Sequence, residues 1–167
     1  ENFWSLLFEE MGETWTPVTD VVGVDPDVDE VDCGGDAFSG GDLVNVSFYC
    51  IDSDTIYFDA VNLIPTLNQI GDYAVATEIA RQYAFAAQAR LGNLDNTRAT
   101  NLQADCFAGL FAHSGFVGDR EGRGQELFLS PGDLDEAVIA FLSDSDAADE
   151  VSDDAASVAT AFTRFDA

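Results

Sequence analysis

An acid and a guanidinium stand three residues apart in the alanine-rich segment 74–88, AVATEIARQYAFAAQ. Residues three or four positions apart are neighbours on a helix surface, so Glu78 and Arg81 are placed to form an ion pair. A segment so poor in bulky side chains has little reason to carry two opposite charges unless they serve a site. Residues 74–88 are therefore the first candidate for one.

Alternating acids at Asp25, Asp27 and Asp29 resemble a calcium-binding loop. Pro26 occupies the second position of that loop, and Glu30 stands where an EF-hand requires glycine. We expect a solvated acidic loop, with a weak cation site of another geometry as the alternative.

Three cysteines leave one without a partner inside the chain. Cys33 and Cys50 flank a Gly/Asp-rich loop, and a disulfide across it would add about 3 kcal/mol to the free energy of unfolding in the loop-entropy model. Cys106 falls within a predicted helix, where we expect a small buried hydrophobic residue. No Cys-x-x-Cys pair or His/Cys cluster indicates a metal site.

His113 is the sole histidine, so a Ser–His or Cys–His catalytic pair cannot form without it. Its position near the end of a predicted helix favours an interaction with the terminal carbonyls over catalysis. The 32 acids make any choice of two catalytic carboxylates arbitrary.

The chain of 167 residues carries a formal charge of -26, and all 6 of its basic residues are arginines. Such a charge disfavours nucleic acid and anionic lipid as partners, and favours basic protein segments or solvating cations. No apolar run is long enough to span a bilayer, so we expect no membrane span in these residues, although an anchor could lie outside them. The acidity is also compatible with a salt-adapted protein whose charge serves only solubility.

The pattern predicts a single α+β domain over residues 1–167, with a small antiparallel hairpin and several helices. The hairpin is expected from NVSFYC (45–50) and TIYFDA (55–60), after an extended stretch over 15–24. Helices, turns and loops are expected as follows: helices over 1–12, 72–91, 98–112, 130–144 and 155–165, a connector with a short helix over 62–71, a glycine-rich loop over 115–128 and a surface turn over 143–154.

Three segments together resemble a bacterial family of extracytoplasmic neutral zinc metallopeptidases. The segment CGG followed by SFYCIDSDTIYFD (47–59) resembles the family's Cys-Gly, Phe-Tyr-Cys-Pro-x-Asp and Tyr-x-Asp pattern, with Ile51 in place of the proline. GDYAVATEIARQYAFAAQARLG (71–92) aligns with the Ala-His-Glu-x-x-His helix, and NLQADCFAGLFA (101–112) with Glu-x-Gln-Ala-Asp-Cys-Phe/Tyr-Ala-Gly. LSPGDLDEAVIAFL fits the helix that follows in actinobacterial-type members. The resemblance covers nearly the whole chain and implies a zincin-like fold.

The resemblance breaks at the zinc ligands. It places the two histidines of the helix on Thr77 and Arg81 and the third ligand, a glutamate, on Asn101, while the general-base position keeps its acid as Glu78. A hydroxyl, a guanidinium and an amide make a poor zinc shell, so the resemblance implies that the zinc is lost and no cofactor remains. We expect Arg81 to supply the missing positive charge by pairing with Glu78 and with Asp105, which makes the old site structural. The alternative is that Arg81 reaches solvent and pairs with no specific group.

These observations predict a catalytically inactive, metallopeptidase-like pseudoenzyme. We expect it to act outside the cytoplasm as a binding or structural subunit of a cell-envelope complex, with an extended partner docking along an edge strand near TIYFDA. The alternative function is an active metal-dependent peptidase with a relocated metal site, drawing on Glu78, Asp105, His113 and the acidic loops.

Overall fold

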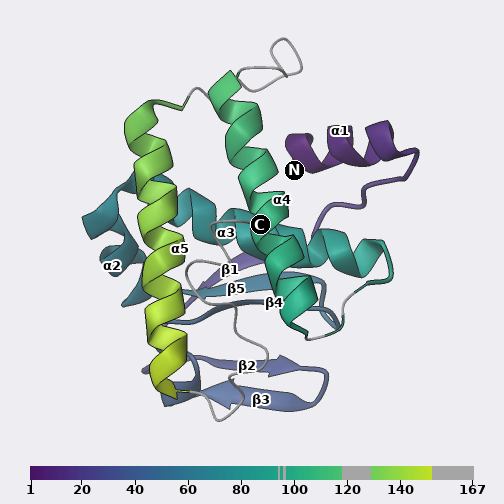
Figure 1. Cartoon of the computed structure of the whole chain (residues 1–167). Coiled ribbons are helices and arrows are strands. Elements are labelled where there is room, and N and C mark those ends of the chain that lie inside the picture. The colour runs from purple at the N-terminus through teal and green to yellow at the C-terminus, as the bar shows by residue number, and fades with distance from the viewer. Residues whose placement is uncertain (94, 96, 118–128, 152–167) are drawn as a thin grey trace.

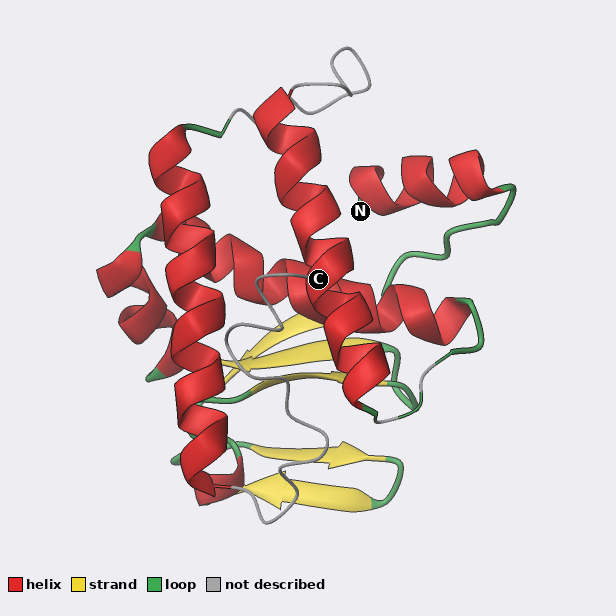
Figure 2. Ribbon diagram, in the orientation of Figure 1, coloured by secondary structure: helices red, strands yellow, loops and turns green. Residues whose placement is uncertain are grey.

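The computed structural model describes residues 1–93, 95, 97–117 and 129–151, and these residues form five helices and two small sheets (Figures 1 and 2). The predicted α+β class is confirmed. Among the described residues, no helix is both long enough and apolar enough to cross a membrane. The predicted last helix over 155–165 and most of the predicted glycine-rich loop lie outside the described residues.

The larger sheet has the strand order β1-β5-β4. The predicted hairpin is confirmed: β4 (Ser47–Cys50) pairs antiparallel with β5 (Thr55–Asp59). β1 (Asp20–Val24) lies parallel to β5 on its other side. β5 is therefore paired along both edges, and among the described residues the free edges of this sheet belong to β1 and β4 beside it. The docking of an extended partner along an edge strand near TIYFDA stays a prediction.

The smaller sheet is a second hairpin, in a stretch where the sequence predicts only an acidic loop and the Gly/Asp-rich loop between the two cysteines. Its strands are β2 (Glu30–Cys33) and β3 (Asp36–Ser39), followed by a short 3-10 turn over Gly40–Asp42. Gly34 and Gly35 form its two-residue turn and both have positive φ, at 67° and 94°. Two positive φ angles in succession are what the tight turn of a right-twisted hairpin requires, and glycine adopts them without strain.

The predicted disulfide between Cys33 and Cys50 is confirmed, and it joins the end of β2 to the end of β4. It therefore fastens the small hairpin to the larger sheet. Beside it, one apolar cluster with Val24, Val31 and Leu43 at its centre fills the space between the two sheets.

The helical layer is built around α3 (Asp72–Arg90), which contacts α2 (Leu63–Ile70), α4 (Arg98–Val117), α5 (Pro131–Val151) and β4. In Figure 1, α4 and α5 both cross α3. The predicted helix over 72–91 is confirmed, and Gly92 follows it with a φ of 70°. The surface turn predicted over 143–154 is wrong as far as Val151, because α5 continues through that residue.

Alanine allows these helices to approach one another closely. Alanine makes up much of the buried faces of the three long helices, and small side chains reduce the distance between helix axes. The fully or nearly fully buried alanines are Ala74, Ala80, Ala84, Ala86 and Ala87 of α3, Ala104 and Ala108 of α4, and Ala137 and Ala140 of α5. α1 (Asn2–Met11) covers one end of this layer with Phe3, Trp4 and Phe8, packed with Trp15.

Arg90 ties the end of α3 to the larger sheet. Its guanidinium makes two contacts with the Asp54 carboxylate, at 2.9 and 3.0 Å, and its Cζ lies 4.4 Å from the centre of the Trp15 ring. The hydroxyl of Tyr49 donates to the same carboxylate at 2.7 Å. Burial, followed by this hydrogen bond, raises the pKa of Tyr49 to about 12.

Asp59 closes the turn after β5. Its buried carboxylate accepts backbone N–H groups from Asn45 and Val61 at 2.8 Å and from Asn62 at 2.9 Å. Burial alone would raise its pKa, but these hydrogen bonds favour the ionised form, and the pKa of Asp59 is lowered overall.

Replacing both Cys33 and Cys50 by alanine is expected to lower the free energy of unfolding by about 3 kcal/mol, because the unfolded chain regains the freedom of the open loop. Urea titration of each protein measures the free energy of unfolding. Cys106→Ala is the matched control, since it removes a thiol and no cross-link. Equal stability of the double variant and the control would contradict the assignment.

Asp59→Asn is expected to lower the free energy of unfolding at pH 7 by about 1–3 kcal/mol, because the amide replaces one accepting oxygen with a donor facing other donors. The lowered pKa of Asp59 means that its contribution is present above its unfolded value of about 4 and is lost as the pH falls through the folded value. The difference between wild type and variant should therefore shrink on acidification in urea titrations. A difference between wild type and Asp59→Asn that is the same at pH 7 and in acid would contradict this role. Asp27→Asn is the control, because Asp27 is exposed.

Candidate functional site

The residues singled out from the sequence lie where α3 crosses α4. Thr77, Glu78 and Arg81 come from α3, and Asn101 and Asp105 come from the first half of α4. Thr77 and Arg81 are four residues apart, so they occupy successive turns on one side of α3. Two helices thus supply the ion-pairing residues.

Arg81 and Asp105 form a buried ion pair across the two helices. Nε of Arg81 lies 2.7 Å from Oδ1 of Asp105, and the side chains are 16% and 1% exposed. The guanidinium carbon also lies 5.2 Å from the centre of the Phe85 ring. The predicted pairing of Arg81 with Asp105 is therefore confirmed. The pairing is needed because a carboxylate removed from water to this degree is stable only beside a cation or several hydrogen-bond donors.

Glu78 has different partners from those predicted. Its Oε1 accepts a hydrogen bond from Oγ of Ser47 on β4 and another, 3.0 Å long, from Nε2 of Gln82. Gln82 is only 1% exposed, and its Nε2 also lies 2.7 Å from Oγ of Ser47. Neutral donors from its own helix and from the sheet thus bind one oxygen of this carboxylate. The predicted cluster of Glu78, Arg81 and Asp105 divides into an ion pair and this separate polar triad.

Ser47 and Gln82 were missed by the sequence reading. Gln82 follows Glu78 by four residues, a spacing that puts both side chains on one helix face and could have been noticed. Ser47 could not be found in this way, because its approach to Glu78 depends on how α3 packs on β4. A serine beside a carboxylate lacks the intervening base that activates a hydroxyl nucleophile. His113, the sole histidine, is exposed on α4.

The side chains at the three inferred ligand positions do not fit a zinc ion. Oγ1 of buried Thr77 donates to the Tyr73 carbonyl at 2.9 Å, within its own helix. Arg81 brings a permanent positive charge, and Asn101 brings an amide. A catalytic zinc takes three nitrogen, sulfur or carboxylate ligands and keeps one open position, which this set cannot provide.

Two other groups in the described part of the chain bring potential ligand atoms within 4.8 Å of one another. The first, Cys33 with Cys50 and Asp52, is built on the disulfide. The second is the carboxylate group of Asp72, Asp133 and Glu136, at the N-terminal ends of α3 and α5.

Hydrogen bonds in the second group serve the helix ends. Glu136 accepts the backbone N–H of Tyr73 at 2.9 Å, and Asp133 accepts that of Ser130 at 2.6 Å. Unpaired N–H groups at a helix start favour such carboxylates without any metal. Neither group includes Thr77, Arg81 or Asn101.

The acids of the predicted calcium-like loop bind their own backbone. Asp29 accepts the N–H of Asp25 at 2.8 Å, and Asp25 accepts that of Asp27 at 3.0 Å. This is a turn held by aspartate side chains, as the expected solvated loop would be.

The expectation for Cys106 is wrong: its thiol is free and exposed on α4, because the neighbouring Ala104 and Asp105 take the buried face.

Comparison with known proteins gives two relatives, both described as the uncharacterized protein YpfJ, from Escherichia coli strains K12 and O6:H1. Each is 30% identical to this chain over 159 residues, covering 84% of the chain and 50% of the relative. The chain therefore spans about half the length of the curated relatives it matches. No family model matches the chain, and no solved structure matches it.

Arg81→Met is expected to lower the free energy of unfolding by about 3–5 kcal/mol, because it leaves the buried Asp105 carboxylate without its cation. The double variant Arg81→Met/Asp105→Leu should lose less than Arg81→Met alone, since no charge is then buried. Urea unfolding of the four members of the cycle gives the coupling energy.

Arg98→Met is the matched control for this cycle, because Arg98 is exposed on the same helix as Asp105. It should change the free energy of unfolding by no more than about 0.5 kcal/mol. Additive effects of the two substitutions at positions 81 and 105 would show that the pair is not coupled.

Proposed function

We propose that this chain is a non-catalytic, metallopeptidase-like domain with a zincin-like fold that acts outside the cytoplasm as a binding or structural subunit of a cell-envelope complex. The observation that carries the proposal is the buried Arg81–Asp105 ion pair. At the position where the resemblance places the second zinc ligand, α3 carries a permanent cation. A fixed guanidinium balances a buried acid but cannot activate water as a metal ion does.

The arrangement of Glu78 supports the same proposal. In a working peptidase of this kind, the acid at this position must be free to take a proton from water. Here Ser47 and Gln82 both donate to its Oε1. Glu78 therefore serves to join α3 to β4.

The disulfide supports the proposed compartment. Disulfides persist in secreted, periplasmic and cell-surface proteins and are rare where thiol reductants are abundant. The Cys33–Cys50 bond fastens one hairpin to the larger sheet, and Cys50 is fully buried. A buried disulfide that joins two sheets in this way favours an extracytoplasmic protein.

The second candidate function is a metal-dependent peptidase with a relocated metal. The specific observation in its favour is the carboxylate group of Asp72, Asp133 and Glu136. Against it, Glu136 and Asp133 accept backbone N–H groups at helix ends, and Glu78, the inferred general base, belongs to the separate triad with Ser47 and Gln82.

Metal content and hydrolysis distinguish the two functions. Purified protein, stripped with chelator and re-exposed to zinc, is expected to retain less than one zinc per chain by elemental analysis and to leave a panel of unstructured peptides intact. The companion variant is Thr77→His/Arg81→His/Asn101→Glu, which should gain a zinc ion, because it restores the ligand set of a catalytic zinc on the same two helices. Stoichiometric zinc in the wild type, together with chelator-sensitive peptide cleavage, would contradict the proposal.

A further inference from the structure

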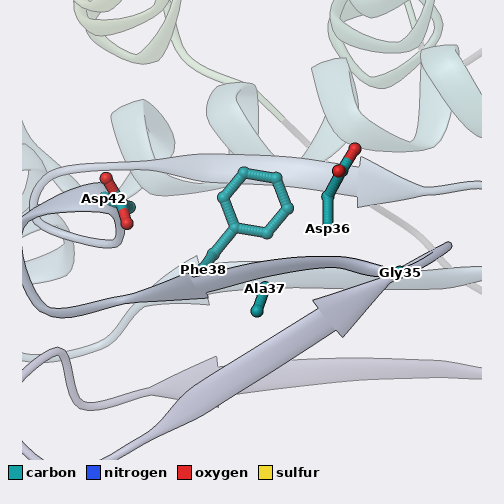
Figure 3. Close-up of a pocket in the computed structure, with 5 residues that line it drawn as sticks. All are labelled: Gly35, Asp36, Ala37, Phe38 and Asp42. Carbon is teal, nitrogen blue, oxygen red and sulfur yellow. The ribbon is translucent and has the colours of Figure 1, made fainter.

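An open pocket of about 560 Å³ lies against the β2–β3 hairpin, away from the α3–α4 crossing. Its lining residues are Gly35, Asp36, Ala37, Phe38 and Asp42. In Figure 3 the Phe38 ring stands between Asp42 and Asp36, with these three side chains on one side of β3 and Ala37 on the other. The pocket therefore offers an aromatic ring flanked by two carboxylates.

This hairpin is held firmly in place. The Cys33–Cys50 disulfide fastens it to β4, and the Phe38 ring packs 5.3 Å from that of Phe48, centre to centre. Phe38 is half-buried: it packs against the apolar cluster between the sheets and also lines the pocket. A site held rigid before binding loses less conformational entropy when a ligand arrives.

The chemistry of this pocket fits a cation. Asp36 and Asp42 are exposed carboxylates, and an aromatic face attracts a guanidinium or ammonium through its quadrupole. Residues 1–80 contain no lysine or arginine, so the segment that forms the pocket brings no basic side chain of its own. The surrounding negative potential would draw a basic ligand in.

The backbone beside the pocket favours a polypeptide over a small polyamine. In the part of the chain that the structure describes, β3 pairs with β2 alone, which leaves its other edge open for main-chain hydrogen bonds. An extended segment can add to such an edge while its side chains enter neighbouring pockets. The exposed edge and the acidic pocket lie on the same strand.

We propose that this pocket binds an arginine or lysine side chain of an extended, basic segment of a partner protein. The inference rests on the proposed binding role and names its partner class. It places the docking strand at β3, a different edge from those of β1 and β4 beside TIYFDA.

The test measures binding of a labelled peptide that carries three arginines in a Gly/Ser background, by fluorescence anisotropy at physiological salt. Asp36→Asn/Asp42→Asn should weaken binding about tenfold or more, because both flanking charges are lost. Phe38→Leu should weaken it less, through loss of the aromatic face alone. The matched control is Glu9→Gln/Glu13→Gln, which removes the same charge from two exposed positions, one on α1 and one just after it, and should leave binding nearly unchanged.

Three results would overturn the inference. Equal weakening by the pocket pair and the control pair would show that only the overall charge attracts the peptide. Undiminished binding of a citrulline version of the peptide would remove the role of the cation. Displacement by spermidine as effective as by unlabelled peptide of equal charge would assign the pocket to polyamines. Thermal unfolding of every variant shows whether it is folded. Because this experiment measures neither zinc nor hydrolysis, its failure is distinct from failure of the proposed function.

Discussion

The structure depends on placing a cation beside the carboxylate of Asp105. That side chain lies 1% exposed in the interface between α3 and α4, where an unpaired negative charge would cost about 3–5 kcal/mol, a large share of the free energy that folding supplies. Arg81 reaches it from the facing helix at 2.7 Å. The pair fixes how the two helices cross, and it explains why an otherwise alanine-rich helix carries a guanidinium.

A chain with a charge of -26 has few cations to distribute, and two of its six arginines bridge elements of this core. Arg81 joins α3 to α4, and Arg90 joins α3 to the sheet through Asp54 and covers the Trp15 ring. Among the described residues the other buried acid is Asp59, and neutral backbone N–H groups bind its carboxylate. Arginine is suited to these positions because its planar guanidinium can bind a carboxylate and pack on a ring together.

Much of the local structure could be predicted from the sequence because it is encoded locally. The helix over 72–90, its glycine terminus, the β4–β5 hairpin and the Cys33–Cys50 pairing all follow from short-range spacing. What depends on packing between distant segments could not be predicted: the parallel pairing of β1 with β5, and Ser47 meeting Glu78 from 31 residues away. The β2–β3 hairpin was missed because its strands are short and acidic, which is also the composition of a solvated loop.

The central claim is that a fixed guanidinium stands where the resemblance places a metal ion. Anomalous diffraction from crystals soaked in zinc, recorded on both sides of the zinc absorption edge, tests this most directly. The account predicts no anomalous peak within bonding distance of Thr77, Arg81 or Asn101, and an Arg81 guanidinium still on Asp105. A strong peak bound to any of those three side chains, with Arg81 turned away, would contradict it.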